Sequence, residues 1–232
     1  MILLAGSVKG GTGKTVTSAN LGVERARAGK QVLLVDADAD QGNLNDWAAL
    51  RSEAGIEPAL TRVMLKGRDT AQQLLRLRDK FDDIIIDCGG FDSQELRQAL
   101  VVADLWLIPM KPSQFQIWTL DKLLELRELA LGFRTTPLQG CLLAARASTH
   151  PAHDDRATLD AVLRQRGLDG FRVLNAVIHE RAAYTMAEGQ GMGVSELPRS
   201  DRGVRSAVAE IQSLHQEIFE DARETAAALV EA

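Results

Sequence analysis

Short apolar runs alternate with longer amphipathic segments along the chain. Runs of Val, Leu and Ile without polar interruption are typical of strands that are buried on both faces of a parallel sheet. The predicted strands are Ile2–Ala5, Val32–Val35, Ile84–Ile86, Leu105–Ile108, Leu142–Ala145 and Val173–Ile178. Helical spacing of apolar residues predicts helices over Val16–Ala28, Gln94–Val102, Leu120–Leu131, Leu159–Arg166 and about Arg202–Ala228. This alternation predicts an α/β fold, a mostly parallel twisted sheet with helices on both faces.

The pattern runs through the chain without a repeat, a low-complexity block or a Pro/Gly/Ser-rich linker, so residues 1–232 are predicted to form one domain. Hydrophobic residues make up 45% of the sequence, enough for a substantial core. The first apolar run breaks at Gly6, too early for a signal peptide, and no run approaches the length of a transmembrane helix. We therefore expect a cytoplasmic protein.

Composition excludes several kinds of site. Cys88 and Cys141 lie far apart and no CxxC occurs, which argues against a disulfide framework, a zinc site and a thiolate-held iron–sulfur cluster. The net charge of −5 argues against a molecule that is basic overall and binds nucleic acid through its whole surface. Arginines nevertheless cluster between Arg164 and Arg205, whereas the end of the chain after Glu217 is acidic.

The stretch SVKGGTGKTVTSANLG, Ser7 to Gly22, lies between the first predicted strand and the first predicted helix. A glycine-rich loop in this position can turn its backbone N–H groups around phosphate oxygens, and the helix N-terminus adds partial positive charge. Lys14 would reach the β and γ phosphates, and the Thr15 hydroxyl would bind Mg²⁺. The sequence therefore predicts a phosphate-binding loop.

The loop departs from the pattern G-x-x-x-x-G-K-[ST], because its first glycine falls on Val8. Lys-Gly-Gly-x-Gly-Lys-Thr instead resembles the deviant Walker A motif of the ParA/MinD superfamily of P-loop ATPases. The resemblance implies that Lys9 crosses the interface of an ATP-bound homodimer and contacts the phosphates of the partner's ATP, so that Lys9 and Lys14 both serve catalysis. The implied nucleotide contacts are Lys9, Gly10, Gly11, Thr12, Gly13, Lys14, Thr15 and Val16.

A second motif, VLLVDADADQGNLNDW, places carboxylates at the end of a buried strand, beside the phosphate loop. It resembles the family's DxDPQGN segment. The resemblance puts Asp36 near the hydration shell of Mg²⁺ and makes Asp38 the catalytic residue that orients or deprotonates the attacking water. This chain is one residue longer than the family pattern and lacks its proline, so Asp40 competes for the second role. Asp40 could also simply cap a helix.

A third motif, FDDIIIDCGG, is an apolar strand that ends in Asp87. It resembles a Walker B motif, whose aspartate holds Mg²⁺ through water. Gly89 and Gly90 would let the chain approach the γ-phosphate closely. Cys88 is interpreted as a small buried residue.

The resemblance continues to about Phe219. Residues 107–123, LIPMKPSQFQIWTLDKL, correspond to a strand, turn and helix near the family's dimer interface. Residues 177–197, VIHERAAYTMAEGQGMGVSEL, correspond to the backbone that lies against the adenine.

Within the superfamily, the chain is most similar to the short ParA-type partition ATPases, because a phosphate loop starting at Lys9 leaves no N-terminal helix-turn-helix domain. The resemblance implies a nucleoid-associated ATP dimer that binds DNA non-specifically, with slow, Mg²⁺-dependent hydrolysis of ATP to ADP and phosphate, stimulated by a ParB-like centromere-binding partner. The candidate DNA contacts are Arg164, Arg166, Arg199, Arg202 and Arg205, with Arg172 and Arg181 in the wider cluster.

Two alternatives stay open. The arginines could be solvated, salt-bridged surface residues. The cargo could be a protein, as in relatives that position chemotaxis, secretion or conjugation machinery. A membrane anchor is not expected, because the C-terminal end, HQEIFEDARETAAALVEA, is acidic and has a weak apolar face.

Overall fold

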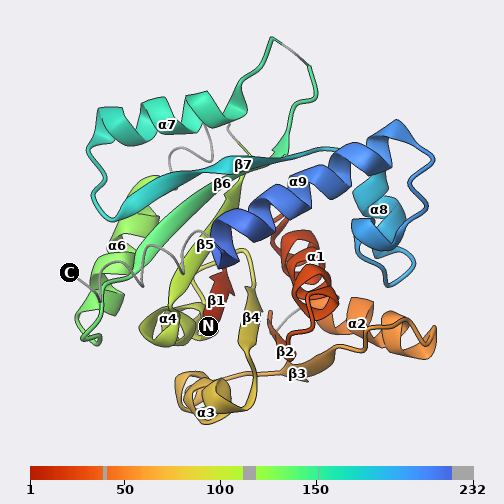
Figure 1. The fold of residues 1–232 in the computed structure, drawn as a ribbon. Coiled ribbons are helices and arrows are strands. Elements are labelled where there is room, and N and C mark those ends of the chain that lie inside the picture. The colour runs from red at the N-terminus through yellow and green to blue at the C-terminus, as the bar shows by residue number, and fades with distance from the viewer. Residues whose placement is uncertain (39–40, 112–118, 151, 221–232) are drawn as a thin grey trace.

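Seven parallel strands form one sheet in the order β3-β2-β4-β1-β5-β6-β7 (Figure 1). The computed structural model describes residues 1–38, 41–111, 119–150 and 152–220. The strands are β1 (Ile2–Ala5), β2 (Val32–Ala37), β3 (Thr61–Met64), β4 (Asp83–Cys88), β5 (Leu105–Met110), β6 (Gln139–Ala147) and β7 (Phe171–His179). All neighbouring pairs are parallel, as the uninterrupted apolar runs predict.

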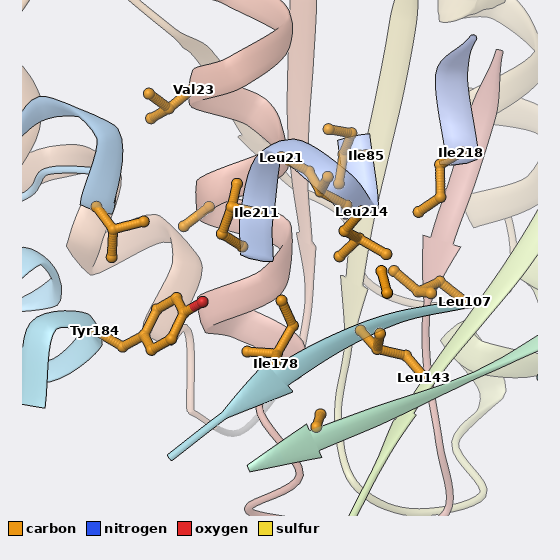
Figure 2. Packing of buried hydrophobic residues seen from close by; sticks show 14 of the residues in the cluster. Leu21, Val23, Ile85, Leu107, Leu143, Ile178, Tyr184, Ile211, Leu214 and Ile218 are labelled. Carbon is orange, nitrogen blue, oxygen red and sulfur yellow. The ribbon is translucent and has the colours of Figure 1, made fainter. Parts of the chain in front are cut away.

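Helices cover both faces of the sheet. They are α1 (Lys14–Arg27), α2 (Asn43–Glu53), α3 (Thr70–Leu77), α4 (Gln94–Val102), α6 (Leu120–Leu131), α7 (Asp155–Arg166), α8 (Ala182–Glu188) and α9 (Arg202–Phe219). Buried side chains of α1, α2, α8 and α9 form one hydrophobic cluster with the sheet, and those of α3, α4, α6 and α7 form another on the opposite face. Figure 2 shows the first cluster, in which Leu21 of α1 and Ile211 and Leu214 of α9 pack over Leu143 and Ile178 of the sheet.

The predicted fold class and all the predicted strands are confirmed, but the pattern missed the edge strand β3. Thr61–Met64 carries mostly exposed side chains, so it lacks the apolar run that marks the other strands. The sequence prediction also omitted α2, α3 and α8. The predicted helix starts at Val16 and Leu159 are too late, because α1 begins at Lys14 and α7 at Asp155. The last helix is described as far as Phe219, and the predicted continuation to Ala228 lies outside the described residues.

The strand order changes direction at β1, near the centre of the sheet. The chain runs from β1 outward through β2 and β3, returns to β4, and then passes to β5 on the other side of β1. The connection after β1 leads to β2 on one side and the connection after the adjacent β5 leads to β6 on the other, so the two diverge at the carboxyl edge of the sheet. In open α/β sheets, ligands bind at such a switch point, and the first loop of this chain lies there.

Candidate nucleotide-binding site

The phosphate loop joins β1 to α1 and relies on glycine for its shape. Gly11 and Gly13 have φ values of 69° and 92°, in the left-handed region that glycine adopts without strain. Gly13 is the residue immediately before α1. Gly90, after β4, lies against the loop so closely that a Cβ there would be 2.4 Å from the Cα of Gly10. The two backbones can meet only because position 90 has no side chain.

The second lysine of the loop is buried in the site. Lys14 is 7% exposed, and its Nζ donates a hydrogen bond to the Lys9 carbonyl at 3.1 Å. Burial lowers the pKa of the Lys14 ammonium, and the carboxylates of Asp87 and Asp38 partly oppose that shift. A buried ammonium whose charge is only partly compensated is a strong site for an anion.

Asp87 lies at the end of β4, next to the start of α1. The Thr15 hydroxyl donates to its Oδ2 at 2.6 Å, while Oδ1 is buried and lacks a hydrogen-bond partner among the described residues. Burial raises the pKa of the Asp87 carboxyl to about 7, although the Thr15 hydrogen bond and the Lys14 charge oppose the rise. Thr15 and Asp87 therefore present oxygens side by side, one of them unsatisfied.

Asp36, at the end of β2, is engaged by the backbone. Its Oδ1 accepts from the Asp38 N–H at 3.0 Å, and its Oδ2 accepts from the Asn45 N–H at 2.8 Å in the first turn of α2. Burial raises the pKa of Asp36, and these two hydrogen bonds oppose the rise. Asp36 thus holds a backbone N–H in the first turn of α2, whereas Asp40, whose suggested capping role stays a prediction, lies outside the described residues. Oxygens that each accept one N–H can still accept a water, so the predicted role beside hydrated Mg²⁺ stays open.

Asp38 follows β2, and the segment after β4 lies between it and the phosphate loop. Its carboxyl group faces the Gly89 backbone, because a Cβ on Gly89 would approach its Cγ to 3.2 Å, and its Oδ1 accepts from the Gln41 N–H at 3.3 Å. Asp38 also lines the pocket described next. Asp40, the competing candidate, lies outside the described residues.

A pocket of about 400 Å³ opens above the phosphate loop. One wall is formed by the loop and the first turn of α1, from Gly10 to Thr17, with Asp38 and Gly90. The opposite wall comes from the ends of β6 and β7 and from α8. Its members are Ala145, Arg146, Ile178, His179, Glu180, Arg181, Tyr184, Thr185 and Glu188. The pocket is of the size that small-molecule sites have, and most of the second wall falls within the stretch 177–197 that was predicted to meet the adenine.

One carboxylate of α9 organises the second wall. Glu210 accepts hydrogen bonds from the His179 ring at 2.8 Å, from Arg181 Nε at 2.7 Å and from the Tyr184 hydroxyl at 3.0 Å. All three partners line the pocket, whereas Glu210 lies behind them. The sequence analysis missed Glu210 and Arg146, and it did not single out Glu180 within the predicted stretch 177–197. Their partners are about thirty residues away or more, so sequence spacing carried no signal for them.

The site fits a magnesium nucleotide. Lys14 and the loop backbone offer positive potential to phosphates, and the hydroxyl of Thr15 with the unsatisfied oxygen of Asp87 suits a cation that prefers oxygen ligands. No group of three His, Cys, Asp or Glu side chains that could hold a metal occurs in the described parts of the chain. Mg²⁺ commonly binds through one or two protein oxygens, water and substrate phosphates, and this arrangement provides such a site.

Lys9 differs from Lys14 in its surroundings. It is exposed at the rim of the loop, and its ammonium makes no ion pair with any residue that the structure describes. Its predicted action on a partner's nucleotide stays a prediction, and so do the individual nucleotide contacts. Residues 112–118, the centre of the segment predicted near the dimer interface, lie outside the described residues.

The candidate DNA-binding arginines fall into two groups. Arg164 and Arg166 lie at the end of α7, which leads into the amino end of β7, and they pair with Asp160 and Asp121. Arg199, Arg202 and Arg205 lie at the start of α9, beside α8, at the opposite end of the molecule (Figure 1). The structure therefore does not unite all five in one patch.

The second group is the better candidate for a free basic surface. Arg199, Arg202 and Arg205 are exposed and form no ion pair within the described ranges, which end at Glu220. Of the wider cluster, Arg172 pairs with Glu217, and Arg181 with Glu210 at the pocket wall.

Cys88 is buried, as interpreted from the sequence, and Cys141 is buried as well. Among the helices of the described residues, none combines the length and the apolarity that crossing a bilayer requires.

Comparisons with known proteins agree with this geometry. The sequence matches the CobQ/CobB/MinD/ParA nucleotide binding domain over residues 3–194. It is 30% identical to the maintenance of carboxysome distribution protein A of Halothiobacillus neapolitanus over 94% of this chain and 95% of that relative. It is 27% identical to the chromosome partitioning protein ParA of Caulobacter vibrioides over 83% of this chain and 85% of that relative.

A solved structure shows the same fold. The septum site-determining protein MinD of Pyrococcus horikoshii, in complex with Mg-ADP, superposes with a TM-score of 0.72 at 22% identity, covering 95% of this chain and 96% of that one. From the family match, the extended identity to these relatives and the deviant phosphate loop, we conclude that the chain belongs to the ParA/MinD group of P-loop nucleotide-binding ATPases.

Proposed function

We propose that this protein is a ParA-type positioning ATPase whose ATP-bound homodimer holds DNA non-specifically and releases it after hydrolysis. The observation that carries the proposal is the pair of lysines in one loop. Lys14 is buried and lines the pocket, whereas Lys9 is exposed and immediately precedes Gly10 of the pocket lining. A pocket that needed only to bind its own nucleotide would have no use for the second lysine.

Within one subunit, Lys14 and the loop N–H groups would bind the phosphates of ATP. Thr15 and Asp87 would hold Mg²⁺, with Asp36 positioned to hydrogen-bond to its water shell. Bound Mg²⁺ would neutralise charge on the β and γ phosphates. Asp38, at the mouth of the same pocket, would orient the attacking water and accept its proton.

Across the dimer, Lys9 would place its ammonium on the phosphates of the partner's ATP. A cation supplied in trans stabilises the charge of the transition state, as an arginine finger does. The two subunits would then dimerise only around ATP. Hydrolysis, expected to be slow, would remove the phosphate contact of Lys9 that holds the dimer together.

The ATP dimer would bind DNA through Arg199, Arg202 and Arg205. These arginines lie on one loop and the first turn of α9, so twofold symmetry brings two copies of the cluster to the assembly. Contacts to phosphates carry no sequence information and weaken steeply with salt.

The partition role proposed from the sequence would require a ParB-like partner bound to a centromere. A second candidate is the positioning of a protein cargo. It is favoured by the identity to a carboxysome distribution protein over almost the full length of both chains. A neighbouring gene for a small DNA-binding protein, with repeated sites beside it, would favour partition.

DNA binding is tested by fluorescence anisotropy with a random-sequence duplex, with ATP and Mg²⁺, across a salt series. We expect wild-type protein to bind only with ATP. Replacing Arg199, Arg202 and Arg205 together with Glu should abolish binding, because the positive charges that contact the phosphates become negative. A variant that loses a single phosphate contact should show a log–log salt slope lower by roughly one unit.

The comparison variant replaces Arg164 and Arg166 with Glu at the far end of the molecule. It should retain most of the binding. Loss in this variant and not in the triple variant would place the DNA on α7. Absence of binding by the wild-type ATP complex would contradict the DNA step altogether and leave a positioning ATPase that works on protein alone.

A further inference from the structure

Arg146 has a backbone conformation unlike that of any other non-glycine residue in the described chain. Its φ is 51°, in the left-handed region, where the other described residues with positive φ are glycines. A bulky side chain there is strained, and such strain persists where the surrounding structure enforces it, often at ligand sites. Arg146 lines the nucleotide pocket.

A bulge in the sheet produces this conformation. Ala145 pairs with Ile178 and Ala147 with His179, so two steps along β6 oppose a single step along β7. Arg146 is the extra residue. Bulges next to active sites commonly redirect a side chain, and this one redirects an arginine at the carboxyl edge of the sheet towards the phosphate loop.

The redirected guanidinium has two partners. Its Nη1 donates to the Gly11 carbonyl at 3.0 Å, and its Nη2 donates to Oε1 of Glu180. Along the way, the side chain passes Gly13, where a Cβ would lie 3.8 Å from Arg146 Cγ. Glu180 also pairs with Lys111 at 3.5 Å. The arginine is thus fixed at both sides of its planar fork.

The bond to Gly11 acts on a peptide of the loop that can change its orientation. Gly11 lacks a Cβ, so its peptide with Thr12 can rotate at little cost. That peptide is planar and trans, and its C=O and N–H point in opposite directions. Holding the Gly11 carbonyl against Arg146 therefore turns the Thr12 N–H to the side away from Arg146 and sets the orientation of the loop's donors.

We propose that Arg146 is a positioning residue of the nucleotide site, which fixes the phosphate loop in its triphosphate-binding shape through the Gly11 carbonyl. The proposal rests on the nucleotide site proposed above. The bulge and the left-handed conformation of Arg146 would cost local strain, and in return they would hold the loop preorganised for the nucleotide. Glu180 acts through Arg146 by holding the other half of the guanidinium.

The decisive variant is Arg146→Gly, because glycine adopts a φ of 51° freely and removes the side chain only. Its Tm without nucleotide should stay near the wild-type value, since relief of strain and the greater freedom of glycine in the unfolded chain offset each other. Its Kd for Mg-ATP, measured by isothermal titration calorimetry, should rise roughly 5- to 20-fold, which is at or below the lower end of the effect of losing one charge-assisted hydrogen bond, because Arg146 acts on the nucleotide only through the loop.

Three further variants make the test specific. Arg146→Lys keeps the charge without the fork and should fall between wild type and Arg146→Gly. Glu180→Gln should weaken binding by a smaller factor, and should add nothing in the Arg146→Gly background. Arg78→Ala is the control, since Arg78 is an arginine of similar exposure paired with one carboxylate, Asp104, at the amino edge of the sheet.

A Kd within about twofold of wild type in Arg146→Gly would overturn the proposal, as would a lowered Tm with unchanged Kd, which would show a merely structural role. Lys14→Ala distinguishes this failure from that of the site itself. If wild type binds Mg-ATP and Lys14→Ala does not, the site stands and only the role of Arg146 falls. If wild type fails to bind, the proposed function falls with it.

Discussion

Removing the buried charge of Asp87 should stabilise the protein in the absence of nucleotide. A rise of the pKa from 3.8 to about 7 corresponds to about 4 kcal/mol in the free energy of ionising this carboxyl. The unfolded chain ionises near the lower value and the folded protein near the upper one. This group's contribution to folding is therefore most favourable below about pH 4 and is lost as pH rises towards 7. The amide side chain of the Asp87→Asn variant would be neutral throughout.

The expected gain in the free energy of unfolding is smaller than the full increase in the free energy of ionising Asp87 in the folded protein. Among the nearby carboxylates, Asp87 stabilises the charge of the buried Lys14 ammonium most strongly, and Asp87→Asn removes this interaction. We expect a net gain of roughly 1–3 kcal/mol at pH 8, equivalent to a Tm increase of roughly 2–10 °C for a chain of this size. The gain should shrink towards pH 5, where wild-type Asp87 is already protonated.

The assay is thermal unfolding at pH 5, 6, 7 and 8 without nucleotide or Mg²⁺. Asp169→Asn, at an exposed aspartate that forms no ion pair in the described chain, is the control. The same Asp87→Asn protein should bind Mg-ATP more weakly than wild type, and wild-type affinity should increase from pH 6 to pH 8 as the carboxyl ionises. A lower Tm for Asp87→Asn at pH 8, or a difference that does not change with pH, would refute the reasoning.

Three further predictions concern the pocket. Lys14→Ala should weaken ATP binding by roughly 100-fold, since a buried cation loses its phosphate contact, and calorimetry should show little residual heat. Asp38→Ala should bind ATP normally without releasing phosphate; normal turnover there, with Asp40→Ala inactive, would move the water-orienting role to Asp40. Glu210→Gln should raise the Kd for ATP several-fold by loosening the pocket wall, whereas Glu217→Gln, which loses hydrogen bonds to the β7 backbone away from the pocket, should lower Tm only.

Sequence identified the features that depend on neighbours along the chain. The phosphate loop, the strand that ends in Asp87 and the buried parallel strands all follow from local patterns. Other features depend on contacts between distant residues. The left-handed φ of Arg146 and the bond from Arg181 to Glu210 arise only when β6, β7 and α9 come together.

The arginine cluster shows the same limit. Arg164 and Arg205 belong to helices that lie close along the chain, with β7 and α8 between them. In the structure, however, α7 ends at the amino edge of β7, whereas α9 begins on the far side, next to α8. The topology decides which charges share a surface. The edge strand β3 was missed for a different reason, because it packs too little apolar surface to produce a hydrophobic run.

The central claim is that ATP dimerises the protein through Lys9, and the molar mass in solution tests it most directly. Multi-angle light scattering should give one subunit, 25.2 kDa, without nucleotide, and twice that mass for Asp38→Ala with ATP and Mg²⁺. Adding Lys9→Ala to Asp38→Ala should leave ATP bound and the mass at one subunit. A mass that does not change with ATP, or a full ATP dimer without Lys9, would contradict the account.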